Sequence, residues 1–363
     1  MNFKRLGAMS AIALVGTIVL SSCAANEAGT TTPSASASTL TGTLNGSGAS
    51  SQGSAQEAWI AAFQTANPNV TVNYDPAGSG AGRKAFAAGG VNFAGSDSAL
   101  KPEEITAGFT GCVAGSGYLQ VPVYISPIAV VFNVAGVKDL KLDAATIAGI
   151  FKGTITAWND PAIAATNSGV TLPSATITAV HRSDDSGTTK NFADFLNKVA
   201  PAVWDAKPAD AFPYPVGEAA QGTSGVIDAV TNGTNTIGYA DASKAKALGI
   251  AAIAVGTEFV KPSAEGAAAV VAASPAGATA SASDLSIAID RKTSDPTHYP
   301  LVLVSYAIAC LQYTDAKAAP LVAAYLTYIA GPDGQKAAAA AAGSAPLASD
   351  LSAKVAAVLA TIK

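Results

Sequence analysis

The chain has 363 residues, of which 49% are apolar and 13% are charged, and its net charge is -4. This length suits one large domain or two medium ones, and the apolar content excludes disorder throughout the chain. The small negative charge and the absence of a Lys/Arg-rich run argue against a nucleic-acid partner. An anionic ligand stays possible, because a small site can bind an anion through local dipoles.

The first 22 residues are typical of a lipoprotein signal peptide. Lys4 and Arg5 precede an apolar stretch at 6–20, which is short for a membrane-spanning helix. The Leu-Ser-Ser-Cys sequence ending at Cys23 resembles a bacterial lipobox and predicts lipidation of Cys23. Residues 23–40 are small and polar, as in a flexible tether. We therefore expect an extracytoplasmic protein that is lipid-anchored to the outer face of the cell membrane; an ordinary cleaved signal with an incidental cysteine is the alternative.

Beyond the tether, short strand patterns alternate with helical patterns. We expect strands at 70–74, 91–94, 128–133, 176–181, 236–239 and 301–308, and helices at 79–88, 144–151, 188–199 and 319–341, the last broken at Gly331-Pro332. The Ala/Ser/Gly-rich residues 264–283 are expected to form a surface insertion. The alternation predicts an α/β fold with mostly parallel sheets flanked by helices.

Glycines and hydroxyl residues gather in four segments, at 46–51, 78–82, 95–98 and 182–188, where a strand pattern ends and a helix pattern follows. A helix N-terminus offers unpaired N–H groups and a positive dipole end. Glycine allows close approach of the backbone, and Ser and Thr add donors. Each segment alone is better explained as an ordinary helix cap. Together the four predict an anion site without naming the anion.

Few residues support an enzyme such as a secreted phosphatase or hydrolase. His181 and His298 are the two histidines of the chain, and it contains neither a Gly-x-Ser-x-Gly motif nor a Gly-Lys dipeptide. We therefore expect no catalytic residue, no metal and no cofactor. Apart from Cys23, the cysteines are Cys112 and Cys310, and an exported location permits a disulfide between them. Two separate buried thiols are the alternative.

Six stretches, in this order, resemble the phosphate-binding proteins of bacterial high-affinity phosphate ABC importers: 44–50, 78–80, 91–97, 156–163, 181–189 and 236–239. The most specific are Arg-x-Asp-x-Ser-Gly-Thr at 182–188 and Trp-Asn-Asp-Pro at 158–161. The resemblance covers about 41–363 and is weakest at 250–295. It implies a monomeric, two-lobe periplasmic-binding-protein fold of type II, which delivers phosphate to the permease subunits of an importer. Lobe I would be 41–126 plus 299–363, lobe II would be 127–298, and the ligand cleft would lie between them.

The resemblance also implies which residues hold the ligand. Ser50 stands where the family commonly has Thr, and Ser51 where many members have Phe. Asp184 is expected to pair with Arg182 and orient it. The implied phosphate ligands are Ser50, Ser51, Ser79, Asp97, Arg182, Ser186, Gly187 and Thr188.

Asp97 is the most informative of these residues. An ionised carboxylate only accepts hydrogen bonds, and phosphate near neutral pH keeps a proton to donate whereas sulfate does not. Asp97 therefore predicts selection of phosphate over sulfate. The alternative role of Asp97 is to cap a helix near Pro102. The alternative functions are binding of another oxyanion, such as sulfate or molybdate, and a signalling or adhesin lipoprotein on the same fold; arsenate is not distinguished from phosphate.

Overall fold

The computed structural model describes residues 38–245 and 247–363. The predicted signal peptide, Cys23 and most of the tether therefore lie outside the described residues. Within the described ranges, no helix is both long and apolar enough to cross a membrane. Residues from Ser38 onward form one compact unit that ends at Lys363.

Two sheets run through this unit. The larger has nine strands in the order β2-β1-β3-β12-β4-β8-β6-β7, with β9 also paired to β4, and the smaller has the order β11-β10-β5. The strands are β1 (Gly42–Gly48), β2 (Val70–Asp75), β3 (Phe93–Ser96), β4 (Tyr118–Asn133), β5 (Lys141–Leu142), β6 (Thr178–Arg182), β7 (Glu218–Ala220), β8 (Thr236–Asp241), β9 (Gly249–Ile250), β10 (Ala252–Val255), β11 (Glu258–Val260) and β12 (Val302–Cys310).

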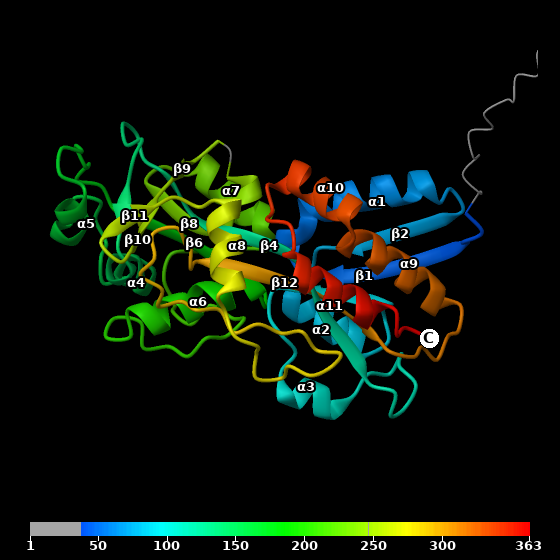
Figure 1. The fold of residues 1–363 in the computed structure, drawn as a ribbon. Coiled ribbons are helices and arrows are strands. Elements are labelled where there is room, and N and C mark those ends of the chain that lie inside the picture. Colours follow the sequence, from blue (N-terminus) through cyan, green and yellow to red (C-terminus); the bar gives the residue numbers. More distant parts are fainter. Residues whose placement is uncertain (1–37, 246) are drawn as a thin grey trace, which may run out of the picture. The chain divides into compact units, whose positions relative to one another are not determined.

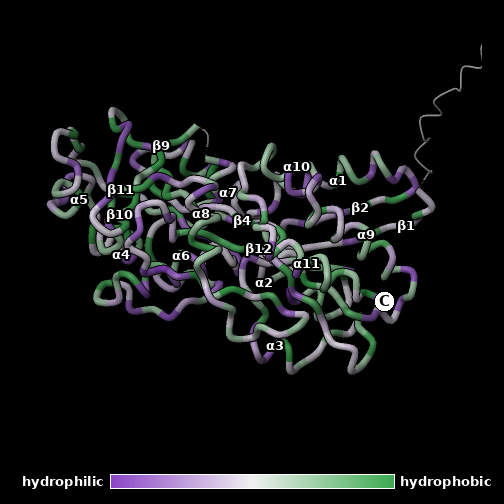
Figure 2. The backbone as a smooth tube through the Cα atoms, viewed as in Figure 1, coloured by the Kyte–Doolittle hydropathy of each residue, from purple (hydrophilic) through white to green (hydrophobic). Residues whose placement is uncertain are grey.

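Helices flank the larger sheet (Figure 1). They are α1 (Gly53–Ala66), α2 (Ser79–Ala87), α3 (Pro102–Ala107), α4 (Ala144–Lys152), α5 (Pro161–Thr166), α6 (Gly187–Val199), α7 (Gly222–Asn232), α8 (Ala264–Ala272), α9 (Ala318–Ala330), α10 (Pro332–Ala342) and α11 (Ser349–Leu359), with short 3-10 helices η1 (Ser50–Gln52) and η2 (Ala242–Lys244). Figure 2 shows hydrophilic residues along α3, in which no residue is buried.

The predicted α/β class is confirmed, but the sheet is mixed and not mostly parallel. β1 pairs in parallel with β2 and β3, and β6 pairs in parallel with β7 and β8. Between these groups, β12 and β4 are antiparallel to each other and to their outer neighbours β3 and β8. Alternation of strand and helix patterns does not report the direction of β12, which returns from late in the chain to lie between β3 and β4.

β4 links the two parallel groups of strands. It has 16 residues, more than the six predicted at 128–133, and its residues between the two ends are all buried. It pairs with β12 up to Pro127 and with β8 from Ile128 onward. This change of partner falls beside the predicted lobe boundary at 126–127, which stays a prediction.

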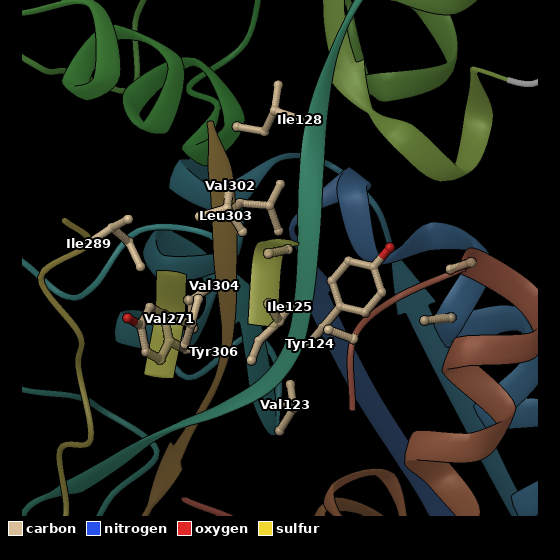
Figure 3. Close-up of a cluster of buried hydrophobic side chains, with 14 of the residues drawn as sticks. Val123, Tyr124, Ile125, Ile128, Val271, Ile289, Val302, Leu303, Val304 and Tyr306 are labelled. Atoms are coloured by element: carbon tan, nitrogen blue, oxygen red, sulfur yellow. The ribbon is translucent and has the colours of Figure 1, made fainter. Parts of the chain in front are cut away.

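β4 and β12 lie side by side in the hydrophobic core. Figure 3 shows Ile125 of β4 beside Val304 of β12, with Val123 and Val302 further along the same two strands, and all four are at most 2% exposed. Each fully buried aliphatic side chain contributes about 1.5–3 kcal/mol relative to exposure. Burial of these side chains therefore stabilises the pairing of the two central strands, beside which the strand-end loops lie.

The prediction of a surface insertion at 264–283 is wrong for its first half. Residues Ala264–Ala272 form α8, in which Gly266, Ala267, Val270 and Val271 are buried. Small side chains allow this close packing, since a Cβ on Gly266 would lie 3.1 Å from the Tyr299 Cβ. The alanine-rich composition therefore reflects close packing of a helix, not a solvated loop.

A disulfide joins Cys112 to Cys310, and these residues are 198 positions apart in the sequence. Cys310 ends β12, and Cys112 lies before β4. The bond ties the loop after α3 to the end of a central strand.

Candidate anion-binding site

The four Gly/hydroxyl segments lie at the ends of strands or the starts of helices, as predicted. Ser51 lies in η1 just after β1, Asp97 directly follows β3, and Arg182 is the last residue of β6. Ser79 begins α2, and Ser186 is the N-cap of α6. Ligands in α/β sheets bind outside the carboxyl ends of parallel strands, so this is the position at which a site is expected.

Asp97 is the centre of the cluster and is 4% exposed. Its Oδ1 accepts hydrogen bonds from the Ser51 Oγ and the Ser305 Oγ, both at 2.6 Å, and its Oδ2 accepts one from the Thr188 Oγ1 at 3.1 Å. Burial raises the pKa of Asp97, while these hydroxyls and the Arg182 charge act in the opposite direction. Asp97 does not cap the following helix, because the N-cap of α3 is Lys101.

Ser79 and Gly187 lie close to Asp97 from two different helices. The Ser79 Oγ accepts the Asp97 backbone N–H at 3.1 Å, which leaves the Ser79 hydroxyl proton for another acceptor. A Cβ on Gly187 would lie 2.6 Å from both the Asp97 Cβ and the Ser79 Oγ. Only glycine fits there, and its absence of a side chain lets the start of α6 approach the carboxylate.

Arg182 forms a two-bond pair with Asp184, as predicted. The Arg182 Nε donates to the Asp184 Oδ1 at 2.7 Å, and Nη2 donates to Oδ2. The Gly222 N–H donates to the same Oδ1 at 3.0 Å. Burial of Asp184 disfavours its charge, but the hydrogen bond and charge of Arg182 outweigh this and lower the pKa of Asp184. The pair holds the Arg182 plane and, among the described residues, leaves Nη1 without a side-chain partner.

Ser186 and Ser50 use their hydroxyls differently. The Ser186 Oγ accepts the Thr189 N–H at 3.2 Å, as an N-cap does. The Ser50 Oγ accepts the Thr223 N–H at 3.0 Å, at the start of α7. Five residues of the predicted set thus lie in direct contact: Ser51, Ser79, Asp97, Gly187 and Thr188. Arg182 lies where its charge acts on Asp97. The Ser50 side chain is instead directed toward α7.

Ser305 and Asn191 are site residues that the sequence analysis missed. Ser305 lies inside the apolar strand β12, where nothing marks it as functional. The Asn191 Nδ2 donates to the Asp97 backbone oxygen at 2.7 Å and to the Gly187 oxygen at 2.9 Å. Asn191 lies one helical turn after Gly187, and this position on α6 is the one signal that the sequence offered.

Asp210 was missed as well, although it joins the two predicted lobes. Its Oδ2 accepts from the Arg83 Nη2 at 2.7 Å, and its Oδ1 accepts from the Ser98 Oγ at 2.8 Å. Burial disfavours the Asp210 charge, but Arg83 outweighs it and lowers the pKa of Asp210. Arg83 also donates to Glu104 through its Nε at 3.0 Å. Asp210 and Arg83 are both nearly fully buried.

A cavity of about 420 Å³ adjoins the cluster, and Asp97, Lys190, Asn191 and Arg291 are among the residues that line it. In the part of the chain that the structure describes, no group of His, Cys, Asp and Glu side chains could hold a metal ion. Chemically, the cluster offers hydroxyl and backbone donors, one guanidinium and one carboxylate. This combination suits a small oxyanion that carries a proton.

The comparisons with known proteins identify the family of the chain. A profile of the PBP superfamily domain matches residues 33–333. The chain is 36% identical over 337 residues to Phosphate-binding protein PstS3 of Mycobacterium bovis, covering 90% of each chain. It is 34% identical over 375 residues to Phosphate-binding protein PstS 2 of Mycobacterium tuberculosis, covering 99% of each.

Solved structures agree in fold. A high-affinity periplasmic phosphate-binding protein (PfluDING) bound with phosphate aligns with a TM-score of 0.68 at 22% identity, over 87% of this chain and 93% of that one. A phosphate-binding protein from Stenotrophomonas maltophilia aligns with a TM-score of 0.62, also at 22% identity and with the same coverage. At this identity the likeness concerns the fold alone, which is that of the type II periplasmic binding proteins. The chain belongs to the PBP superfamily and, within it, to the PstS family of phosphate-binding proteins.

Proposed function

We propose that this protein binds inorganic phosphate outside the cytoplasm and delivers it to the permease subunits of an ABC importer. The observation that carries the proposal is the buried carboxylate of Asp97 among hydroxyl donors, with the oriented Arg182 guanidinium acting on it. A carboxylate repels a fully ionised anion, but it accepts the proton that phosphate retains near neutral pH. Sulfate would leave this acceptor unpaired.

The proposed ligand set is the predicted one, Ser50, Ser51, Ser79, Asp97, Arg182, Ser186, Gly187 and Thr188. Arg182 would bind phosphate oxygens with its free edge, and the N–H groups at the start of α6 would face the anion. Ser51 and Thr188, which donate to Asp97 here, would turn toward phosphate or share their contacts with it. The relatives named phosphate-binding proteins support phosphate as the ligand.

Phosphate would bridge lobe I (41–126 plus 299–363) and lobe II (127–298) and hold them together. The hinge would lie near 122–128 and 295–300. Support comes from β4, which changes its pairing partner at Pro127 and Ile128. The closed form would then dock on the permease as a monomer, lipid-anchored through Cys23. The role is binding without catalysis, with no cofactor and no nucleic-acid partner.

Isothermal titration of the full chain with phosphate and with sulfate near neutral pH tests the proposal, after bound anion has been removed by partial unfolding and dialysis. One-to-one phosphate binding with no detectable sulfate binding is expected. Asp97→Asn should weaken phosphate binding and admit sulfate, because an amide N–H can donate to an unprotonated oxygen. Equal binding of the two anions by the unmodified protein would refute the role of Asp97. Absence of binding would refute the function.

A further inference from the structure

A line of four buried hydrogen bonds runs from Asp97 into the core. The Ser305 Oγ lies 2.6 Å from the Asp97 Oδ1, and the Gln52 Nε2 lies 2.6 Å from the Ser305 Oγ. The Gln56 Nε2 lies 2.8 Å from the Gln52 Oε1, and the Tyr325 hydroxyl lies 2.7 Å from the Gln56 Oε1. The four residues behind Asp97 are at most 2% exposed. They come from β12, η1, α1 and α9, so the line joins a central strand to helices that are far apart in the sequence.

The chemistry of the end groups fixes the direction of every bond in this line. An ionised Asp97 can only accept, so the single proton of Ser305 must point to it. The Ser305 oxygen is then an acceptor and takes the amide N–H of Gln52. The Gln52 oxygen accepts from Gln56, and the Gln56 oxygen accepts from the Tyr325 hydroxyl. Reversal would require both buried amides to rotate and would leave the Tyr325 proton without its acceptor.

The line also distinguishes the two oxygens of Asp97. Oδ1 accepts from both Ser305 and Ser51, so its two lone pairs are occupied. Oδ2 accepts from Thr188 alone among the side chains of the described residues. Oδ2 is therefore the oxygen with capacity left for a proton that arrives on a ligand.

We propose that Ser305, Gln52, Gln56 and Tyr325 are positioning residues that hold Asp97 as an ionised acceptor and thereby set the preference for a protonated oxyanion over an unprotonated one. This inference rests on the proposed function. Ser305 is the residue that acts directly on Asp97, and the two glutamines and Tyr325 act through it. If Ser305 only filled space in β12, its hydroxyl would not need both a donor, the Gln52 amide, and an acceptor, the Asp97 carboxylate.

The electrostatic surroundings agree with this role. Burial raises the pKa of Asp97, and the Ser305 hydrogen bond is the strongest of the contacts that oppose the shift. The ionisable groups whose charges couple to Asp97 are Arg182, which favours the carboxylate, and Asp241 and Tyr74, whose own pKa values are raised partly by Asp97. Lys190 and Arg291 line the adjoining cavity together with Asp97. Among the coupled charges, Arg182 is the one that favours ionisation of Asp97. Loss of the Ser305 donor would remove the strongest of the hydrogen bonds that keep Asp97 ionised and would leave those from Ser51 and Thr188.

The test compares Ser305→Ala and Gln52→Leu with the unmodified full chain, by titration with phosphate and sulfate between about pH 5 and about pH 8. A hydrogen bond to a charged group is worth roughly a tenfold change in affinity, so Ser305→Ala should lower the phosphate-to-sulfate affinity ratio roughly tenfold. Gln52→Leu should act in the same direction but less strongly, since Ser305 keeps its proton and loses only its orientation. The loss of phosphate affinity at low pH should begin at a higher pH in Ser305→Ala, because Asp97 then protonates more easily.

Thr236→Val is the matched control. Thr236 lies in β8, outside this line of hydrogen bonds, and its buried hydroxyl donates to the Val230 backbone oxygen at 2.9 Å. This variant should leave the ratio and the pH profile unchanged. An unchanged ratio in a folded Ser305→Ala protein overturns the inference, as does an equal loss of affinity for both anions. If Ser305→Ala does not fold, Gln52→Leu decides by the same criteria. Absence of phosphate binding by the unmodified protein would instead refute the proposed function itself.

Discussion

Asp210 provides a way to weaken phosphate binding without touching a proposed ligand. It lies in the proposed lobe II, and its carboxylate accepts from Arg83 and Ser98 of the proposed lobe I, at 2.7 Å and 2.8 Å. These contacts do not involve the anion, so they should favour the closed arrangement with or without it. Asp210→Asn keeps the size of the side chain and removes its charge.

The magnitude follows from the two bonds. A buried hydrogen bond to a charged group contributes about 1.5–3 kcal/mol, and one between neutral groups about 0.5–1.5 kcal/mol. Loss of the charge should therefore cost the closed form about 1 kcal/mol for each bond, or about 2 kcal/mol for the two. This corresponds to a Kd for phosphate that rises by up to about thirtyfold, because a ligand binds more weakly when its competent state is less populated. Arg83 keeps its bond to Glu104 and is not left unpaired.

Isothermal titration with phosphate near neutral pH measures this Kd, and urea unfolding checks that the variant folds. Lys84→Gln is the control. The Lys84–Asp185 pair also joins the proposed lobes, at 2.7 Å, but its side chains are 73% and 42% exposed. An exposed pair contributes little, so Lys84→Gln should change the Kd by less than about threefold. A Kd for Asp210→Asn within about twofold of the unmodified protein would refute the reasoning that these contacts stabilise the binding-competent form.

Three further predictions concern stability and ligand geometry. Replacing both Cys112 and Cys310 by serine should lower the free energy of unfolding in urea by up to about 5 kcal/mol, because the bond closes a loop of 198 residues in the unfolded chain; no change would contradict this. Arg182→Lys should raise the Kd for phosphate at least tenfold, since an ammonium cannot pair with Asp184 through two nitrogens and still present a planar edge, and a wild-type Kd in titration would count against it. Burial raises the pKa of Asp241 from 3.8 to about 6, so the protonated form stabilises the fold below about pH 4, and this contribution is lost as the pH rises through about 6. Asp241→Asn should therefore increase stability near neutral pH by up to about 3 kcal/mol and flatten its pH dependence; unfolding curves at acidic and neutral pH that matched the unmodified protein would exclude this.

Local sequence determined much of the fold and pointed to the residues of the candidate site. Gly78, Gly187 and the caps Asp143 and Ser186 mark helix starts through their own conformational and hydrogen-bonding preferences, and α2, α4 and α6 begin there. Arg182 and Asp184 are two positions apart in the sequence, so the geometry of this pair is also local. The order of these motifs was sufficient to predict the class of fold and the family.

Only the tertiary structure determined what surrounds Asp97. Ser305 is 208 residues from Asp97 in the sequence, Asn191 is 94 away, and Asp210 is 127 away from Arg83. No local pattern distinguishes Ser305 from the apolar residues that flank it in β12. The direction of β12 between β3 and β4 depends on long-range pairing, as does the contact of Gln52 with Ser305. The sequence alone therefore pointed to the residues at the strand ends, while the packing of distant segments decided which hydroxyls donate to each oxygen of Asp97.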